Sequence, residues 1–417
     1  MTRQVDSARA AVAAIQPGDK VVVAGCSGVP SALLQGLMED SERLRGVTLY
    51  SGMLCGPSSY AFMAPPYDER LRYITWHMPH AFMKGIAGAH VEFLPISWAR
   101  VDRFLRDLKP DVALIQLSPQ EGDFYSLGVS PGYHPSAIRY ARTVIAEVNE
   151  RMPWSFGDSR VAASDVDIAL PVSRALLPFD QPTVEDPVLA RVGDMVAELV
   201  PDGAVLQVGV GGIPSATLTG LQRRGREVSL YSLVTDEAVD LARSGGLRPI
   251  TPGGPSIVAV ESMGTQRSFD FVARNPLVHM VPSTRMQNPV ELSRVRALYS
   301  VNSCLEIDLL GQCNSEVLGG KQISGIGGSI DFIEGSWLSE GGRSIVALPS
   351  TTRGGHSRIV PMLAAGTPVT LPRHALHTVV TEYGAVQLYD KSDRERREAL
   401  ISIAHPDHRA ELRRAMK

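Results

Sequence analysis

One segment of the chain occurs twice. The stretch from Ile15 to Leu37, IQPGDKVVVAGCSGVPSALLQGL, returns about 184 residues later, from Leu199 to Leu221, as LVPDGAVLQVGVGGIPSATLTGL. Glycines, prolines, a serine and a leucine coincide at matching positions, so chance similarity between unrelated segments is the weaker explanation. We therefore expect a chain of two similar halves, in which both copies fold in the same way.

Each copy predicts a strand, a glycine-rich turn and a helix. The apolar runs VVVAG and AVLQVG are too short for helices and rich in β-branched residues, which is typical of buried strands. Proline is tolerated only in the first turn of a helix, so the proline after each turn marks a helix start. A second strand, LYSGML or LYSLV, follows. Alternating strands and helices predict an α/β protein with two similar open domains and mostly parallel sheets.

The rest of the chain fits this scheme. A short helix is expected at VDRFLRDLKP, and a charged helical tail from Ser392 to Met416. Further strands are expected at Asp111 to Pro119, Arg142 to Asn149, Ser344 to Ser350 and His377 to Gly384. A proline-rich stretch, LPFDQPTVEDP, separates the halves. It predicts an N-terminal domain over residues 1–183 and a C-terminal domain over residues 184–417.

Composition excludes several classes of protein. With 417 residues, 44% of them hydrophobic, the chain can bury a large core. A net charge of -3 argues against a nucleic acid partner, which would need a basic excess. No stretch approaches the roughly 18 apolar residues of a membrane span, and no secretory signal is evident, so a cytoplasmic location without a membrane partner is expected. The four scattered cysteines are expected to be free thiols.

Glycine-rich loops are candidate ligand sites. GVGGIP runs from Gly209 to Pro214, and SGIGGSIDF runs from Ser324 to Phe332. Glycine lets a ligand approach main-chain N–H groups closely, which suits a phosphate, an amide or an oxyanion. GVGGIP lacks the G-x-G-x-x-G pattern of dinucleotide sites, and a tight strand-to-helix turn explains it equally well. A third segment, STTRGGHSRIVP, combines hydroxyl, guanidinium and imidazole groups, as an anion site does.

Longer motifs carry a family resemblance. GVGGIPSA, EIDLLGQCNSEVLGGKQISGIGGSIDFIEGS, GGRSIVALPSTTRGGHSRIVP and VVTEYGAVQLYDKSDRERREALISIAHPDHR resemble the acetyl-CoA hydrolase/transferase family, which includes 4-hydroxybutyrate and butyrate-type CoA-transferases. In the first half, DVALIQLSP, SLGVSPGYHPSA and RTVIAEVNERMPWSFGDSRVAASDVD are similar to the same family. The resemblance spans nearly the whole chain.

The resemblance implies a pair of open α/β domains that act on a CoA thioester. It implies coenzyme A as a co-substrate rather than a tightly bound cofactor, a small-molecule acceptor, and a homo-oligomer. The residues that it places at CoA and the acyl group are Val208, Gly209, Val210, Gly211, Gly212, Gly325, Gly327, Gly328 and Arg343, the last where the family often has lysine. Main-chain donors there would stabilise the developing thioester oxyanion by roughly 3 kcal/mol each.

One position departs from the family. Transferases of the family use a glutamate in a motif resembling H-T-E-M-x-S-D-G-x-x-D-L, and the matching stretch here, LYSLVTDEAVDL, puts Ser232 at that glutamate. A serine oxyester is less activated than an anhydride, so returning the acyl group to a thiol is uphill. The resemblance thus argues against ordinary CoA transfer. Glu237 is the nearest carboxylate, but an acidic residue is typical of the helix start expected there.

Ser232 has two explanations. It is either an acyl-accepting nucleophile, which requires a base within roughly 3 Å, or a small residue at a strand end, as its repeat partner Ser51 suggests. The candidate bases are four histidines near turns or loops: His77, His80, His134 and His356. Of these, His77 and His134 are preferred. His405 and His408 have a possible metal spacing, but a helix start is expected there and no metal site is predicted.

Three classes of function remain open. The first is an acyl-CoA-processing enzyme without a glutamyl-CoA intermediate, which hydrolyses the thioester, transfers the acyl group to an amine or alcohol, or performs carbon-carbon chemistry. The second is a CoA-transferase between carboxylates in which another group replaces the glutamate. The third is a non-catalytic CoA-binding protein.

Overall fold

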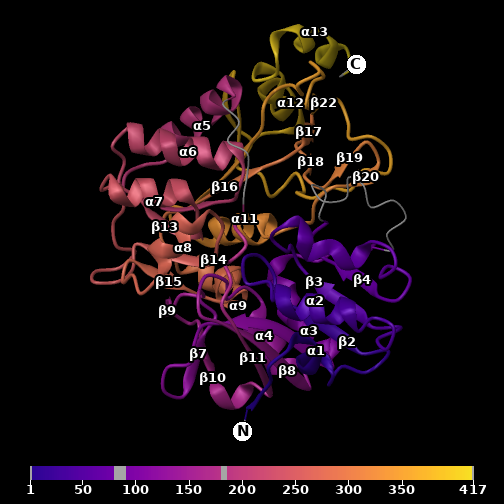
Figure 1. Cartoon of the computed structure of the whole chain (residues 1–417). Coiled ribbons are helices and arrows are strands. Elements are labelled where there is room, and N and C mark those ends of the chain that lie inside the picture. The colour runs from indigo at the N-terminus through magenta and orange to yellow at the C-terminus, as the bar shows by residue number, and fades with distance from the viewer. Residues whose placement is uncertain (1, 79–90, 180–185, 416–417) are drawn as a thin grey trace. The chain divides into compact units, whose positions relative to one another are not determined.

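The computed structural model describes residues 2–78, 91–179 and 186–415. The chain forms two compact units, which Figure 1 follows by chain colour. Unit 1 comprises Met1–Asp180, Val234–Asp236 and Val258–Met286, and unit 2 comprises Gln181–Leu233, Glu237–Ile257 and Gln287–Lys417. The predicted domain division at residues 183 and 184 lies outside the described residues and stays a prediction.

Unit 1 is built on an eight-stranded parallel sheet. Across the sheet the strands are β1 (Arg3–Gln4), β11 (Ile168–Val172), β8 (Thr143–Asn149), β6 (Val112–Leu117), β2 (Lys20–Val23), β3 (Thr48–Ser51), β4 (Arg72–Thr75) and β5 (Val91–Phe93). From β2 the chain adds β3, β4 and β5 on one side, and β6, β8 and β11 on the other. In open α/β sheets, ligands bind outside the carboxyl ends of the strands at such a reversal.

Both faces of this sheet are buried, as its continuous apolar runs predict. Val21 and Val23 belong to one apolar cluster and Val22 to a second, because successive side chains of a strand point to opposite faces. Residues of α1 and α2 join the first cluster, and residues of α3 and α4 join the second. The bounds of these helices are α1 (Ala8–Val12), α2 (Ser31–Glu39), α3 (Val101–Leu108) and α4 (His134–Tyr140).

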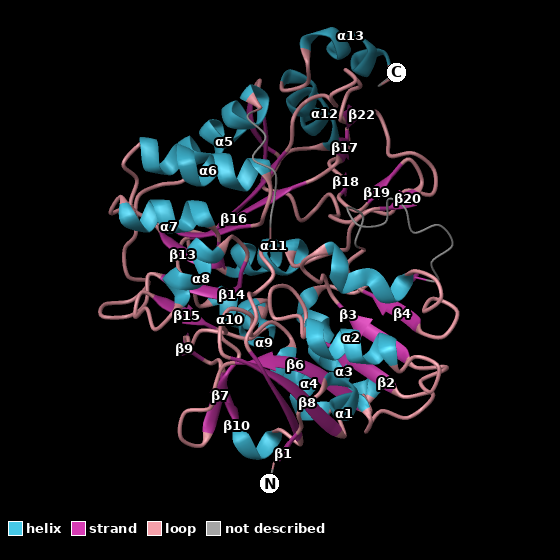
Figure 2. Ribbon diagram, in the orientation of Figure 1, coloured by secondary structure: helices cyan, strands magenta, loops and turns pink. Residues whose placement is uncertain are grey.

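Smaller elements complete unit 1, and Figure 2 distinguishes helices, strands and loops by colour. They are η1 (Pro57–Met63), β7 (Phe124–Ser126), β9 (Phe156–Gly157), η3 (Trp98–Arg100), β10 (Arg160–Ala162), η4 (Ala163–Asp165), β15 (Val278–Met280), α8 (Gln266–Val272) and α9 (Ser283–Met286). β14 (Ile257–Ser262) enters unit 1 after its first residue.

The second sheet has nine strands in the order β24-β23-β21-β16-β12-β13-β14-β15-β9. Its unit 2 strands are β12 (Val205–Val208), β13 (Ser229–Val234, whose last residue is grouped with unit 1), β16 (Leu298–Ser303), β21 (Arg343–Ala347), β23 (Thr378–Thr381) and β24 (Gly384–Gln387). β12 pairs in parallel with β13 on one side and β16 on the other, as β2 does with β3 and β6. The predicted duplication is therefore confirmed in the fold.

Unit 2 also contains helices and two small sheets. They are α5 (Pro187–Leu199), α6 (Gly212–Arg223), α7 (Asp236–Arg243, whose first residue is grouped with unit 1), α10 (Pro289–Ser293), α11 (Ser329–Leu338), α12 (Asp393–Ser402), α13 (Pro406–Arg414), β17 (Glu306–Asp308), β18 (Cys313–Asn314), β22 (Ile359–Val360), β19 (Val317–Leu318) and β20 (Lys321–Gln322). Helices α5 and α6 lie side by side in Figure 1. The four cysteines are buried free thiols, as predicted.

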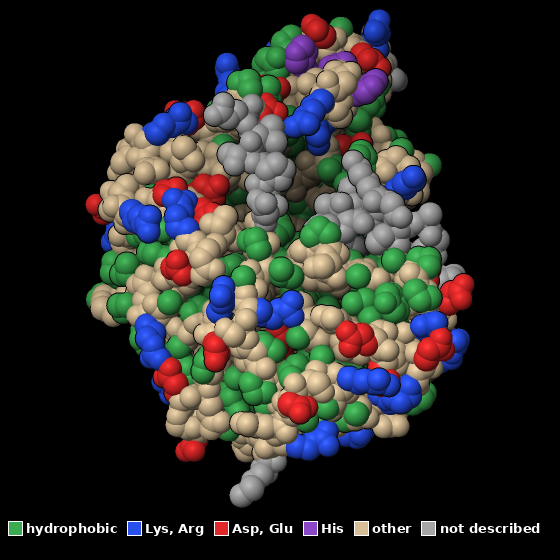
Figure 3. Space-filling view, viewed as in Figure 1, with side chains coloured by type: hydrophobic (Ala, Val, Ile, Leu, Met, Phe, Trp, Pro, Cys, Tyr) green, Lys and Arg blue, Asp and Glu red, His purple; other side chains and the backbone are tan. Residues whose placement is uncertain are grey.

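The charged tail forms two helices rather than one. Ser392 and Glu395 form a capping box that begins α12, and the side chain of His405 caps α13. Leu400 and Ile401 of α12 belong to an apolar cluster of unit 2, so the tail contributes to the core as well as to the surface. On the face drawn in Figure 3, Lys and Arg side chains are interspersed with Asp and Glu.

Candidate active site

The segment from Val208 to Gly212 connects the carboxyl end of β12 to the start of α6. Gly211 has a φ of 120°, a conformation that L side chains rarely adopt, so the turn requires glycine there. A Cβ built at Gly209 or Gly211 meets nothing within 4 Å, so the main chain at both positions borders open space. Val210, between them, is partly exposed. The turn therefore presents main-chain groups where a ligand can approach.

The loop from Gly325 to Gly328 precedes α11, and Gly328 is the N-cap of that helix. α11 ends five residues before β21 starts, so its C-terminus lies at the amino edge of the parallel sheet. A ten-residue helix is about 15 Å long, so its N-terminus reaches the carboxyl edge. The predicted loops therefore begin two helices at the same edge of the unit 2 sheet, and a Cβ at Gly327 would meet nothing within 4 Å.

Arg343 lies elsewhere. It is the first residue of β21, it pairs with Tyr299, and its guanidinium carbon lies 5.9 Å from the centre of the Tyr299 ring. The paired strands place it level with Leu206, before the carboxyl end of β12. The structure thus does not bring Arg343 together with the glycine loops, and a contact between Arg343 and CoA stays a prediction without support from this arrangement.

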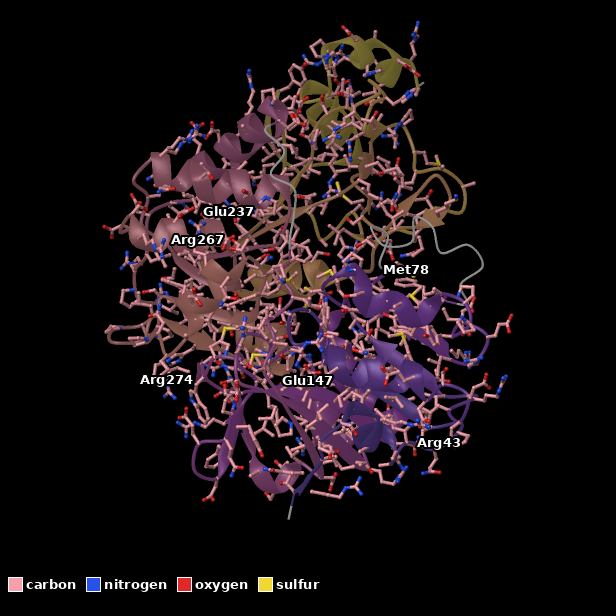
Figure 4. All side chains as sticks on the ribbon, in the orientation of Figure 1. Arg43, Met78, Glu147, Glu237, Arg267 and Arg274 are labelled. Atoms are coloured by element: carbon pink, nitrogen blue, oxygen red, sulfur yellow. The ribbon has the colours of Figure 1, made fainter. Side chains whose placement is uncertain are left out.

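The turns of the two repeats, before α2 in unit 1 and before α6 in unit 2, differ in the side chain that stands at the start of the following helix. In unit 1, the Glu147 carboxylate accepts a hydrogen bond of 2.8 Å from Ala32 N–H, in the first turn of α2. Glu147 is fully buried, and burial is the main cause of its raised pKa. The strand pairings put Val346 at the equivalent position in unit 2. An internal carboxylate thus occupies the helix start in unit 1, whereas an apolar residue stands at that position in unit 2. Figure 4 labels Glu147.

Ser232 is buried, and its hydroxyl is engaged by the neighbouring strand. Its Oγ accepts a hydrogen bond of 3.1 Å from Val208 N–H and donates one of 2.6 Å to the Val208 carbonyl. The main-chain pairing of β12 with β13 runs to Leu206 and Leu230, and two residues further along the Ser232 hydroxyl bonds to the main chain of Val208. This geometry supports the structural explanation of Ser232, and its catalytic role stays a prediction. The hydroxyl of its repeat partner, Ser51, forms a hydrogen bond of 2.7 Å with the Tyr73 hydroxyl.

Glu237 is placed as a helix-start residue. It is the second residue of α7, and its Oε1 accepts a hydrogen bond of 2.7 Å from the Ser215 hydroxyl in the first turn of α6. Figure 4 labels this side chain. The bond joins the starts of two helices, which is the stabilising role that the sequence favours.

The candidate histidines occupy different settings. His134 is fully buried in unit 1, and burial lowers its pKa to about 3. His77 is partly buried in unit 1, and burial lowers its pKa to about 4. His356 is exposed in unit 2, where its N–H bonds to the Thr352 hydroxyl, and His80 lies outside the described residues. His134 and His77 are therefore neutral near pH 7, as a general base must be.

A polar cluster surrounds the first repeat's turn in unit 1. His134 Nε2 accepts a hydrogen bond of 2.8 Å from Gly25 N–H, and the Ser130 hydroxyl donates one of 3.2 Å to the Gly25 carbonyl. The carboxyl group of Glu261, at the end of β14, lies against Gly132, where a Cβ would come within 2.4 Å of Oε1. Glu261 is a member of this cluster to which none of the sequence motifs pointed. A carboxyl near the end of the otherwise apolar strand IVAVES was the available signal.

Comparison with known proteins identifies the family. The N-terminal domain model of the acetyl-CoA hydrolase/transferase family matches residues 1–176, and the C-terminal domain model matches residues 264–416. The 4-hydroxybutyrate coenzyme A transferase of Clostridium kluyveri is 35% identical over 99% of this chain and 96% of its own. The chain belongs to the acetyl-CoA hydrolase/transferase family. The resemblance noted from the sequence motifs is thereby confirmed.

Other members of the family match over most of the chain. The succinyl-CoA:cyclohexane-1-carboxylate CoA transferase of Geobacter metallireducens is 33% identical over 98% of this chain and 93% of its own. RipA from Yersinia pestis has a similar solved structure, with a TM-score of 0.91, 29% identity and coverage of 99% and 96% of the two chains. The 4-hydroxybutyrate CoA-transferase of Porphyromonas gingivalis has a TM-score of 0.82 at 29% identity, covering 99% and 97%.

The part of the chain that the structure describes contains neither a candidate membrane span nor a candidate metal site. Among the residues described, no helix is both long and apolar enough to traverse a membrane. Within the same residues, no group of three or more His, Cys, Asp or Glu side chains is arranged to hold a metal ion. His405 and His408 have ring centres 5.9 Å apart, but His405 caps α13 and His408 Nε2 lies 2.8 Å from the Gly355 carbonyl.

Proposed function

We propose that this enzyme of the acetyl-CoA hydrolase/transferase family hydrolyses acyl-CoA thioesters, or passes the acyl group to a small-molecule acceptor, without a covalent intermediate at position 232. One observation carries the proposal. Both hydrogen bonds of the Ser232 hydroxyl in the described structure go to main-chain groups of Val208, and the acceptor of its proton is a carbonyl oxygen, which is too weak a base to activate the oxygen for attack. By the motif resemblance, this hydroxyl stands where family transferases have a carboxylate, and it is hydrogen-bonded to the main chain.

The glycine loops of unit 2 support coenzyme A as the co-substrate. The turn from Gly209 to Gly212 and the loop from Gly325 to Gly328 start two helices at one sheet edge. Helix N-termini and free main-chain N–H groups favour anions and developing oxyanions. In unit 2 the position equivalent to Glu147 is the apolar Val346, and the Glu237 carboxylate next to the start of α6 accepts its bond from the Ser215 hydroxyl. We propose no tightly bound cofactor.

CoA transfer between carboxylates is the second candidate. Relatives that match nearly the full length are named CoA transferases, and a shorter match, over 49% of this chain, is an acetyl-CoA hydrolase of Kluyveromyces lactis. A transferase would need another carboxylate, and Glu261 is a buried one. A non-catalytic CoA-binding protein is the remaining alternative. Self-association and a cytoplasmic location stay predictions, and light scattering tests the first.

The experiment is incubation with acetyl-CoA and butyryl-CoA, with and without acceptor carboxylates, while free thiol and new thioester are measured and protein adducts are sought by mass spectrometry. The proposal expects thiol release that does not depend on a carboxylate acceptor, with no acyl group on Ser232. CoA exchange between carboxylates through a glutamyl adduct would establish the second candidate instead. Tight CoA binding without turnover would leave the non-catalytic alternative.

A further inference from the structure

Gln207 is a carboxamide on a central strand of the unit 2 sheet, and its amide nitrogen is unused. It is the third residue of β12 and is 4% exposed. Its Oε1 accepts a hydrogen bond of 3.2 Å from Asn302 Nδ2 on the neighbouring strand β16. Its Nε2 has no hydrogen-bond partner among residues 2–78, 91–179 and 186–415, and this nitrogen is not sealed from solvent. Two N–H groups are therefore available to a ligand oxygen.

Other buried carboxamides on the strands of the described structure have their amide nitrogens satisfied. They are Gln116, Asn149, Asn302 and Asn314. Gln116 on β6 is also 4% exposed, but its Nε2 donates to the Val29 carbonyl and its Oε1 accepts from Asn149, both at 2.8 Å. Gln287, just before α10, has an unpartnered Oε1, but that atom is sealed from solvent. Gln207 thus combines burial with a donor that a ligand can reach.

Gln207 and Asn302 stand on the two strands between which the unit 2 sheet reverses. From β12 the chain adds β13 on one side, and β16 and then β21 on the other. The pairs that these strands form are parallel, so their carboxyl ends lie at one edge. In open α/β sheets, ligands bind in the crevice at the carboxyl ends of the strands where the order reverses. The unpartnered amide therefore belongs to the strand pair at which this fold favours a ligand.

The Gln207 side chain leans toward the carboxyl edge of this sheet. Gln207 stands opposite Ser300, yet its amide bonds to Asn302, which is two residues nearer the carboxyl end of β16. Gly209, at the start of the turn before α6, comes two residues after Gln207, and alternate residues of a strand face the same side. A Cβ at Gly209 would meet nothing within 4 Å, so open space adjoins the Gln207 side chain at this edge.

The same face of the sheet is covered by α11. Asn302 pairs with Val346 on β21, and directly paired residues of neighbouring strands point to one face. Val346 belongs to one apolar cluster with Ile333 of α11. The Gln207 amide thus lies on the face where the loop from Gly325 to Gly328, which begins α11, reaches the carboxyl edge.

The position of the amide is set before a ligand arrives. Asn302 Nδ2 donates both to Gln207 Oε1, at 3.2 Å, and to the Ser300 hydroxyl oxygen, at 2.9 Å, so the amide is held through its oxygen. A donor that is fixed in this way needs no reorganisation when negative charge appears beside it, which is how side-chain amides contribute to oxyanion holes.

We propose that Gln207 is a further catalytic residue, whose Nε2 donates a hydrogen bond to the thioester carbonyl oxygen of the bound acyl-CoA. The inference rests on the proposed function, because it takes the acyl group to lie at the glycine loops of unit 2. When a nucleophile attacks the carbonyl carbon, an electron pair of the C=O bond moves to this oxygen. The pair returns when the C–S bond breaks and CoA leaves as thiolate. Gln207 gains and loses no proton, and its N–H dipole stabilises the charge in between.

The test replaces Gln207 with methionine, which has a similar size but no amide, and with glutamate, whose carboxylate offers acceptors in place of the donor. Gln116→Met is the matched control, since Gln116 is equally buried and its amide is already satisfied. Thiol release from acetyl-CoA and butyryl-CoA, affinity for CoA by calorimetry, and melting temperature are measured for wild type and each variant. Rates are taken well below the melting transition.

We expect Gln207→Met to lower kcat by about 100-fold or more, the loss that follows removal of one oxyanion donor. CoA affinity should stay within about threefold of wild type, because free CoA has no acyl carbonyl. Gln207→Glu should lose a similar factor at neutral pH and recover part of its rate relative to wild type as pH falls, because a protonated carboxyl group donates again. Gln116→Met should lower the melting temperature and keep kcat within about threefold of wild type.

The outcomes separate the inference from the proposed function. If wild type exchanges CoA between carboxylates and does not hydrolyse, the proposed function fails, whereas a matching loss of exchange in Gln207→Met still supports the donor, because the same oxyanion forms. If wild type hydrolyses and Gln207→Met or Gln207→Glu keeps its kcat, only the role of Gln207 fails. Weaker CoA binding with unchanged kcat would place the amide at another part of CoA and overturn the assignment. An equal loss of kcat in Gln116→Met would show a general effect of lost amides and overturn it too. Wild type without any turnover overturns both.

Discussion

Replacing Ser232 with alanine separates its two explanations. The hydroxyl makes two hydrogen bonds with the Val208 main chain, and the residue is 2% exposed, so water does not readily replace them. Leaving buried polar groups without partners costs about 1–3 kcal/mol. For the loss of this pair we expect the free energy of unfolding to fall by about 2–3 kcal/mol. Each kcal/mol corresponds to about 2–4 °C in a unit of this size, so the melting temperature should fall by about 5–10 °C.

The assay is calorimetric melting together with thiol release from acetyl-CoA at a temperature well below the transition. If the hydroxyl is structural, Ser232→Ala should keep kcat within about tenfold of wild type, because the chemistry does not pass through this oxygen. Ser51→Ala is the matched control, since it removes the hydroxyl at the repeat position in unit 1, where its partner is Tyr73. An unchanged melting temperature with loss of turnover by three orders of magnitude, and an acyl group on Ser232 in wild type, would refute this reasoning.

Three further changes test the fold and its electrostatics. Glu147→Ala should lower the free energy of unfolding by about 2–3 kcal/mol, because Ala32 N–H loses its buried partner; chemical denaturation measures this, and an unchanged midpoint would contradict it. Gly193→Ala should cost about 1–3 kcal/mol in a thermal melt, since its Cβ would lie 2.4 Å from the Cβ of Ala216 across α5 and α6; full stability would show that the helices separate freely. His134 has a pKa of about 3 in the folded state against about 6.5 when unfolded, so the folded protein binds fewer protons and the free energy of unfolding should fall as pH drops from about 6.5 toward 3. In a His134→Gln variant the free energy of unfolding should depend less steeply on pH. An equally steep dependence in that variant would exclude His134 as its cause.

Local patterns sufficed for most of the fold. The repeated strand, turn and helix predicted β2 with α2 and β12 with α6, because short β-branched runs and first-turn prolines reflect the backbone directly. The sequence also predicted that the turn from Gly209 to Gly212 follows a strand end. A motif does not say at which end of a strand a residue lies, and the position of Arg343 at the start of β21 became visible only in the strand pairing.

The polar cluster of unit 1 could not be predicted in the same way. Glu261, Ser130 and His134 come from distant parts of the sequence and meet only through the packing of β14 against the loop that ends at Gly132. A single glutamate in an apolar strand carries no spacing pattern. Ser232 is the opposite case. A motif pointed to this residue as a candidate nucleophile, but its hydroxyl is hydrogen-bonded to the main chain of the neighbouring strand.

The account depends most on the route that the acyl group takes. A single turnover of acetyl-CoA in water enriched in oxygen-18, followed by mass spectrometry of the released acid and of the protein's peptides, follows that route directly. We expect the heavy oxygen in the acetate, free CoA thiol, and no acyl, CoA or oxygen-18 label on Ser232, Glu237 or Glu261. A CoA thioester or heavy oxygen on any of these side chains, with CoA passed to a second carboxylate, would contradict it.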